Sequence, residues 1–150
     1  MGGKQPVSVL VVIHSRDGRA LLMERADKPG YWQSVTGSRE GSEDLLETAR
    51  REVMEETGLD ASRFELSDWR QVNRYEIYAH WRHRYPEGVT HNDEHVFGLQ
   101  LPQPCEVELA PREHLGYCWL PWAQAAEKVF SPSNAEALRL LPQKLGLALG

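Results

Sequence analysis

Short hydrophobic runs separated by polar turns divide much of the chain into predicted β-strands. The first run, Pro6–His14, is almost continuously apolar and β-branched, as expected of a buried strand. It is followed by an Asp-Gly turn within Arg16–Arg19 and by Ala20–Arg25, the predicted hairpin partner. Three later segments have the same character and are also predicted strands: Trp32–Gly37, which leads into a loop over Ser38–Ser42, Glu94–Leu101 and Gly116–Leu120.

The segment Asp68–Tyr85 is predicted to form either two strands or one long bent strand. Alternation within "HWRHRY" would place His80, Arg82 and Arg84 on one face and Trp81, His83 and Tyr85 on the other. A basic face would suit a triphosphate and an aromatic face would suit a planar ring. The alternative is one solvated face and one face packed on the core, which is the more common reason for such an alternating pattern. His91 and His95, in "HNDEHVF", are interpreted as a loop that enters a strand.

Helical patterns lie between and after these strands. A helix is predicted from Glu43 to Thr57, with Ser42 as its N-cap and Gly58 at its C-terminal end. Leu46, Ala49 and Val53 form its buried stripe. Two more helices are predicted at Pro121–Phe130 and at Ser133–Leu145, the second disturbed by Pro142. Strands and helices in this order predict an α/β protein whose sheet carries helices on its faces.

Composition and charge narrow the class of protein. With 150 residues, of which 41% are apolar, the chain fits one domain over residues 1–150 with a substantial core. A net charge of -5 argues against a duplex nucleic-acid partner. Cys105 and Cys118 lack metal-ligand spacing and indicate a reducing compartment. The longest apolar run, Val9–Ile13, is too short to span a membrane and follows no signal peptide, so a cytoplasmic protein is expected. The oligomeric state is left open.

Candidate chemistry lies in "RREVMEETG", where Glu52, Glu55 and Glu56 crowd the last helical turns. Like charges at these spacings cost about 0.2–0.5 kcal/mol per pair, and the helix dipole favours cations at this end. Arg51 can pair with Glu55 but cannot neutralise three carboxylates. Clustered carboxylates beside a buried stripe suit Mg²⁺ or Mn²⁺, although a solvated acidic face is the alternative that periodicity leaves open.

A longer motif contains these glutamates. From Gly37 to Leu59 the chain reads G-x5-E-x7-R-E-U-x-E-E-x-G-U, in which U is a bulky aliphatic residue. The positions that match are Gly37, Glu43, Arg51, Glu52, Val53, Glu55, Glu56, Gly58 and Leu59. The pattern resembles the Nudix box, with one departure: Ser42 stands where many members have glycine. The resemblance implies an α/β/α sandwich around a mixed sheet, with the box as loop-helix-loop. It also implies metal-dependent hydrolysis of a diphosphate linkage.

The resemblance also implies roles for individual residues. Glu52, Glu55 and Glu56 would bind the metal, expected to be Mg²⁺ with Mn²⁺ as an alternative, and Arg51 would orient them. Glu43 projects from the other side of the predicted helix, which indicates either a structural role or a supporting role outside the direct metal ligands. Glu113, in "EHLGYCWL", would be a further metal carboxylate or the catalytic base. The alternative for Glu113 is an ordinary exposed loop residue.

The flanking segments resemble one branch of the family. "PVSVLVVI", "WQSVTGS", "HWRHRYPEGVTHNDEHVF" and "EHLGYCWL" are similar to the folate-pathway branch, over Lys4–Asn134. That branch converts dihydroneopterin triphosphate to the monophosphate and pyrophosphate. The resemblance places Lys4, Arg25 and Thr36 near the phosphates, and it places Tyr75, Glu76, Ile77, Tyr78 and Ser131 around the substrate.

Two other functions stay open. One is a pyrophosphatase that removes dATP, 8-oxo-dGTP or similar nucleotides, by the same chemistry with a different base pocket. The other is a Nudix module that binds a nucleotide without turnover, which the intact set of box residues argues against. In each case the partner is a small-molecule phosphate compound, with neither duplex nucleic acid nor a membrane involved.

Overall fold

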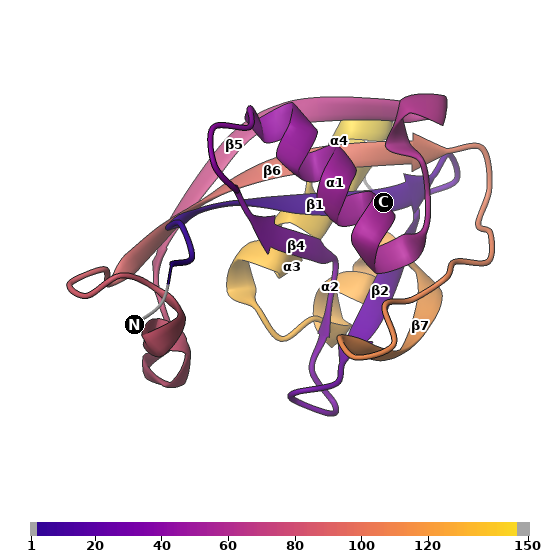
Figure 1. Ribbon diagram of the computed structural model, residues 1–150. Coiled ribbons are helices and arrows are strands. Elements are labelled where there is room, and N and C mark those ends of the chain that lie inside the picture. The colour runs from indigo at the N-terminus through magenta and orange to yellow at the C-terminus, as the bar shows by residue number, and fades with distance from the viewer. Residues whose placement is uncertain (1–2, 147–150) are drawn as a thin grey trace.

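A seven-stranded mixed β-sheet forms the centre of the protein in this computed structural model, which describes residues 3–146 (Figure 1). Its strands are β1 (Val7–Ser15), β2 (Arg19–Arg25), β3 (Trp32–Gln33), β4 (Val35–Ser38), β5 (Glu65–Glu76), β6 (His91–Leu101) and β7 (His114–Pro121). The order is β3-β2-β1-β6-β5, with β4 paired to β1 and β7 paired to β2. β1 and β6 are parallel, whereas the other strand pairs are antiparallel.

The strands β1 and β2 separate soon after their connecting turn. They pair at His14 and Ala20, next to that turn, so the predicted hairpin is present but short. Beyond it, β1 pairs with β4 and β2 pairs with β3 and β7. The sheet is therefore divided at this point, and β4 lies where the two strands diverge.

Helices cover both faces of the sheet (Figure 1). The helix α1 (Leu45–Thr57) lies on one face, and α2 (Trp122–Lys128), α3 (Pro132–Arg139) and α4 (Leu141–Leu145) lie on the other. Alternate residues of β1 serve the two layers: Val9, Val11 and Ile13 pack with α1, whereas Leu10 and Val12 pack with α2, α3 and α4. The predicted α/β/α sandwich around a mixed sheet is confirmed.

The start of α1 differs from the prediction. The helix begins at Leu45 and is capped by Asp44, whose carboxylate accepts the Glu47 N–H at 2.9 Å, so Ser42 as N-cap was wrong. Asp is as good a cap as Ser, and Glu43 is held in the preceding loop by its side chain. The end was predicted correctly, because Gly58 adopts the left-handed conformation at φ 74°.

The buried stripe of α1 also needs one correction. Ala49 and Val53 are fully buried, as predicted, but Leu46 is 36% exposed. Leu45, one position earlier, packs against the core instead. Leu45 therefore faces the core, and its neighbour Leu46 faces solvent.

The segment Asp68–Tyr85 is only partly a strand. β5 already begins at Glu65 and ends at Glu76, and the 3-10 helix η2 (Ala79–Arg84) follows it. The strand alternation predicted for "HWRHRY" was therefore wrong. The ring of Trp81 packs instead against the guanidinium groups of Arg25 and Arg84, at 4.7 and 5.7 Å from the ring centroid. Contacts between distant segments override the local pattern here.

The remaining elements are close to their predictions. β6 begins at His91 instead of Glu94, so the "HNDEHVF" segment is strand throughout. The last predicted helix is broken: α3 ends at Arg139, and α4 begins at Leu141 with Pro142 in its first turn, as the proline predicted. Within residues 3–146, no helix has the length and apolar character needed to cross a membrane.

Candidate active site

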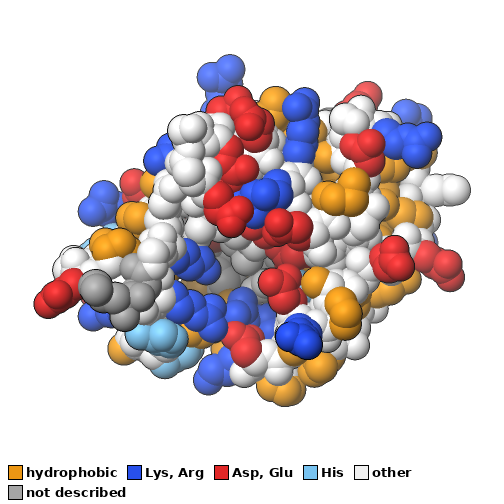
Figure 2. All heavy atoms as spheres, in the orientation of Figure 1, with side chains coloured by type: hydrophobic (Ala, Val, Ile, Leu, Met, Phe, Trp, Pro, Cys, Tyr) orange, Lys and Arg blue, Asp and Glu red, His pale blue; other side chains and the backbone are white. Residues whose placement is uncertain are grey.

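A cleft of about 1140 Å³ begins where α1 meets β4 and extends to the start of α3. Its walls also include residues of β2, β5, β6 and η2. Figure 2 shows Asp and Glu side chains along α1 at one border of a hollow, with Lys and Arg side chains at the opposite border. The cleft therefore combines an acidic wall with a basic one.

Two carboxylates, the half-buried Glu52 and the buried Glu56, form the acidic wall. Glu56 is 3% exposed, and its Oε1 has no hydrogen-bond partner among the described residues. Burial raises the pKa of Glu56 well above its ordinary value, and the neighbouring Glu52 carboxylate raises it further. Burial also raises the pKa of Glu52. The pair is deficient in positive charge.

His114 does not supply that charge. Its Nε2 lies 3.6 Å from Oε1 of Glu56, which is beyond hydrogen-bond distance. Burial, together with the charge of Arg25, lowers the pKa of His114 to about 4. The imidazole is thus neutral at physiological pH and supplies no positive charge to Glu56.

Arg51 connects the loop before α1 to the glutamates of the helix. Its Nη1 donates to Oε1 of Glu52 at 2.7 Å and approaches Glu55 at 3.3 Å. Its Nη2 donates to Glu43 at 2.7 Å and to the Ser38 carbonyl at 2.9 Å. These bonds raise the pKa of Arg51 and lower the pKa of Glu43 to about 2. Glu43 therefore anchors Arg51, which in turn fixes the Glu52 carboxylate.

Gly37 lets strand β4 approach this carboxylate. A Cβ atom at position 37 would collide with the carboxylate carbon and both oxygens of Glu52. The residue is glycine because of this close approach, since its φ is not in the left-handed region. The box glycine and the box glutamate are thus complementary in shape.

The carboxylate pair fits a divalent cation. Two adjacent carboxylates, one buried and one half-buried, supply hard oxygen ligands, and a cation would satisfy the unpartnered Oε1 of Glu56. Within residues 3–146, no three His, Cys, Asp or Glu side chains gather closely enough to form a full protein cage. Mg²⁺ commonly takes one or two carboxylates and completes its shell with water and substrate phosphates, so an incomplete cage is compatible with it.

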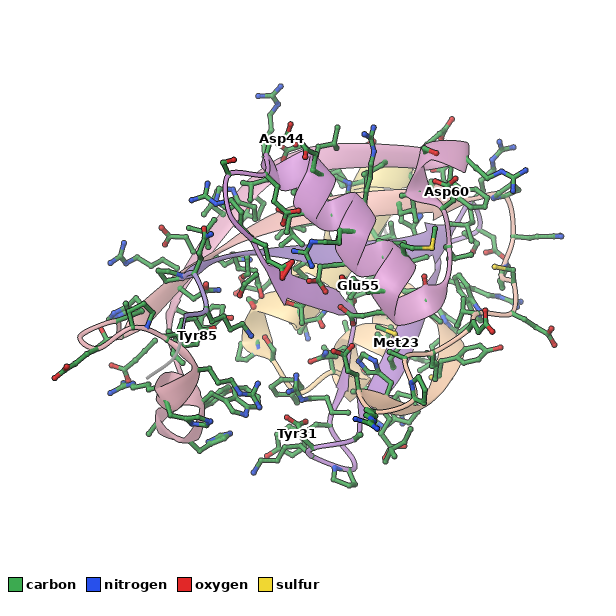
Figure 3. The ribbon with its side chains drawn as sticks, in the orientation of Figure 1. Met23, Tyr31, Asp44, Glu55, Asp60 and Tyr85 are labelled. Atoms are coloured by element: carbon green, nitrogen blue, oxygen red, sulfur yellow. The ribbon has the colours of Figure 1, made fainter. Side chains whose placement is uncertain are left out.

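The other predicted carboxylates lie at different distances from this pair. Glu55 projects from α1 with a side chain that is 54% exposed, and it is outside the cleft lining (Figure 3). Glu113 lines the cleft, and its charge contributes to the raised pKa of Glu56. The structure therefore brings Glu113 toward Glu52 and Glu56, whereas Glu55 reaches them through Arg51.

Three cations form the basic wall. Lys4, Arg25 and Arg84 all line the cleft, and the Lys4 N–H donates to the Arg84 carbonyl at 3.0 Å. Burial and the two arginine charges lower the pKa of Lys4, while Glu52 and Glu56 oppose this effect. Asp27 holds Arg25 through two bonds of 2.7 Å. The cluster thus lies within electrostatic range of the carboxylate pair.

The other predicted substrate residues fall mostly at the cleft. Thr36, Tyr75, Glu76, Tyr78 and Ser131 line it. Ile77 does not line it and is 3% exposed. Ser131 also caps α3, where its hydroxyl accepts the Asn134 N–H at 3.4 Å.

Sequence reasoning missed a polar recess at the far end of the cleft. Asn92 and Glu94 of β6 and Ser133 and Asn134 of α3 line it. Asn92 is 1% exposed and Glu94 is 5% exposed. The available signal was their spacing, because two polar residues at i and i+2 share one face of a strand that is otherwise largely buried.

Comparison with known proteins agrees with this geometry. The NUDIX domain family model matches residues 4–141. The dihydroneopterin triphosphate diphosphatase of Escherichia coli K12 is 45% identical over 138 residues, covering 90% of this chain and 91% of that protein. The protein of the same name from Haemophilus influenzae is 40% identical over 141 residues, covering 91% and 87%. The structure of the E. coli dihydroneopterin triphosphate pyrophosphohydrolase superposes with a TM-score of 0.88 at 41% identity, over 95% of this chain and 99% of that one. The chain belongs to the Nudix family.

Proposed function

We propose that the protein hydrolyses dihydroneopterin triphosphate to dihydroneopterin monophosphate and pyrophosphate, with a divalent metal ion. The observation that carries the chemistry is the pair of Glu52 and the buried Glu56 opposite the basic wall of one cleft. The relatives named dihydroneopterin triphosphate diphosphatase, 40 and 45% identical over most of their lengths, support the substrate.

Each wall has a distinct task in this reaction. Lys4, Arg25 and Arg84 bind the phosphate oxygens of the triphosphate, a role that suits half-buried cations and a guanidinium fork. Glu52 and Glu56 hold the metal ion, which, when bound, offsets charge on the phosphates and on the leaving pyrophosphate. Arg51 keeps the Glu52 carboxylate in place through its 2.7 Å bond.

The proton of the attacking water needs an acceptor. Glu113 is our proposed base, since it lines the cleft and lies close enough to influence Glu56. Glu55 is proposed to act through its contact with Arg51, or to bind a further metal ion once substrate is present. We further propose Mg²⁺ as the metal and a cytosolic location; both rest on the sequence alone.

A substrate panel tests the proposal. Pyrophosphate release is measured with dihydroneopterin triphosphate, dGTP, dATP and 8-oxo-dGTP, each with Mg²⁺ and with EDTA. We expect the pterin to exceed every nucleotide in kcat/KM and EDTA to abolish release. A tenfold advantage for dATP or 8-oxo-dGTP would contradict the pterin assignment. Tight binding of substrate without metal-dependent release would instead indicate a binding module.

A further inference from the structure

The polar recess lies on the opposite side of the sheet from α1. Asn92 and Glu94 share their face of β6 with Val96, which packs in the layer of α2, α3 and α4. Ser8 and Leu10 of β1 line the same cleft from that face. The cleft therefore passes the edge of β4, from the carboxylate pair on one layer to the recess on the other.

Glu94 offers an acceptor oxygen that the protein does not use. Its Oε1 accepts the Ser133 hydroxyl at 2.8 Å and the Asn73 amide at 3.5 Å. No donor among residues 3–146 is bonded to its Oε2. Burial raises the pKa of Glu94, while the bonds from Ser133 and Asn73 oppose the rise. A ligand that brings N–H groups would satisfy this carboxylate.

Asn92 provides a second unused acceptor beside it. Its amide nitrogen donates to Ser8 Oγ at 2.7 Å and to the Tyr75 hydroxyl at 3.1 Å, which occupies both N–H groups. Its Oδ1 is buried without a hydrogen-bond partner among the described residues. A buried acceptor without a donor is costly, and this applies to Oδ1 of Asn92. Together with the unbonded Oε2 of Glu94, it is the complement of a ligand edge rich in donors.

We propose that Glu94 is a specificity-determining residue that accepts the ring N–H and the adjacent amino group of a 2-amino-4-oxo pyrimidine ring. The proposal rests on the proposed function, because it assigns the ring end of the same substrate. A carboxylate can accept two parallel N–H groups in one plane. Pterins and guanine present that pair of donors, whereas adenine presents an acceptor at the corresponding ring nitrogen. Glu94 would therefore select pterin and guanine rings against adenine.

The fold makes this assignment spatially reasonable. The Glu52–Glu56 pair, the basic wall and the recess all line one continuous cleft. A triphosphate held by Lys4 and Arg25 would leave its ring at the far end. Ser133 lies in the first turn of α3, so the helix that orients Glu94 also closes the recess.

Glu94→Gln tests the proposal, since glutamine keeps the shape but replaces one acceptor oxygen by a donor. We expect kcat/KM for dihydroneopterin triphosphate and for dGTP to fall by about 10- to 100-fold, and that for dATP to change by less than about threefold. Binding of dihydroneopterin monophosphate without metal, followed by pterin fluorescence, should weaken by a similar factor. Glu127→Gln, an exposed glutamate of α2, is the matched control and should leave every value unchanged.

The outcomes separate this proposal from the proposed function. If wild type prefers dGTP to the pterin, the proposed function is wrong, yet a selective loss of dGTP turnover in Glu94→Gln still supports the role of Glu94. If wild type prefers the pterin and folded Glu94→Gln keeps the wild-type ratio of pterin to dATP, the inference about Glu94 is overturned. Should Glu94→Gln not fold, Ser133→Ala removes the 2.8 Å bond that orients Glu94. Its pterin-to-dATP ratio should then fall severalfold, and an unchanged ratio would overturn the inference.

Discussion

Replacing Gly37 by alanine should lower the rate of catalysis while leaving the stability of the fold nearly unchanged. The new Cβ would collide with the Glu52 carboxylate, the far end of a flexible side chain, and with no backbone atom among its three nearest neighbours. To reach ordinary van der Waals contact the carboxylate must move by on the order of 1 Å. Displacements of about 1 Å at a catalytic group can cost about 100-fold in rate. The backbone tolerates alanine, because φ at this position is not in the left-handed region.

The expected result is a kcat for Gly37→Ala lowered by about 100-fold. The free energy of unfolding should differ from that of wild type by no more than about 1 kcal/mol, because Gly→Ala at a permitted backbone conformation often stabilises a protein. The measurements are pyrophosphate release over a Mg²⁺ titration and urea unfolding in EDTA. Gly116→Ala, where a Cβ meets nothing within 4 Å, controls for the substitution itself. Wild-type turnover in folded Gly37→Ala would show that the position of the Glu52 carboxylate does not matter for the reaction.

Three further predictions concern the same charges. Glu56→Gln should lower kcat by orders of magnitude, because a hard-cation site loses one charge, while the circular dichroism spectrum stays unchanged. Wild-type turnover in this variant would show that Glu56 is not part of the site. Millimolar Mg²⁺ should raise the Tm of wild type by binding the native state, and less so in Glu52→Gln; equal Tm values for wild type in Mg²⁺ and EDTA would count against a metal site. Because Arg51 lowers the pKa of Glu43 to about 2 from an ordinary 4.5, this pairing stabilises the protein above pH 4.5, and the contribution is lost as the pH falls toward 2. Between pH 4.5 and pH 2, the free energy of unfolding measured with urea should therefore fall by about 1–3 kcal/mol more in wild type than in Glu43→Gln. Equal decreases in the two proteins would refute the coupling between Arg51 and Glu43.

The sequence predicted those parts of the fold whose stabilising contacts lie within one element or one repeating pattern. Apolar periodicity located β1 and α1, and the need for a left-handed residue identified Gly58 as the end of α1. It did not locate η2, because Trp81 is held there by Arg25, a residue far away in sequence. Local propensity cannot predict contacts between residues that are far apart in the sequence.

The same distinction applies to the candidate site. The box gave Glu52, Glu56 and Arg51 together because all three lie on one helix at fixed spacing. The recess could not be found in this way, since it joins β6 to the start of α3, and Glu94 and Ser133 are 39 positions apart. A buried carboxylate in a strand is recognisable as unusual only after its burial is known. The oxygens of Glu94 and Asn92 that lack donors could be identified only from the full set of hydrogen bonds in the structure.

The three glutamates at the end of α1 now have separate explanations. Glu55 is largely solvent-exposed and contacts Arg51, so its repulsion is weak. Glu56 is buried and Glu52 is half-buried, and the two share one guanidinium at most, so their repulsion persists until a cation binds. The ring recess lies on another layer and uses other elements, β6 and α3, so changes there need not disturb the carboxylate pair. A fold arranged in this way can keep its phosphate chemistry while the ring that it accepts is altered by a few residues around Glu94.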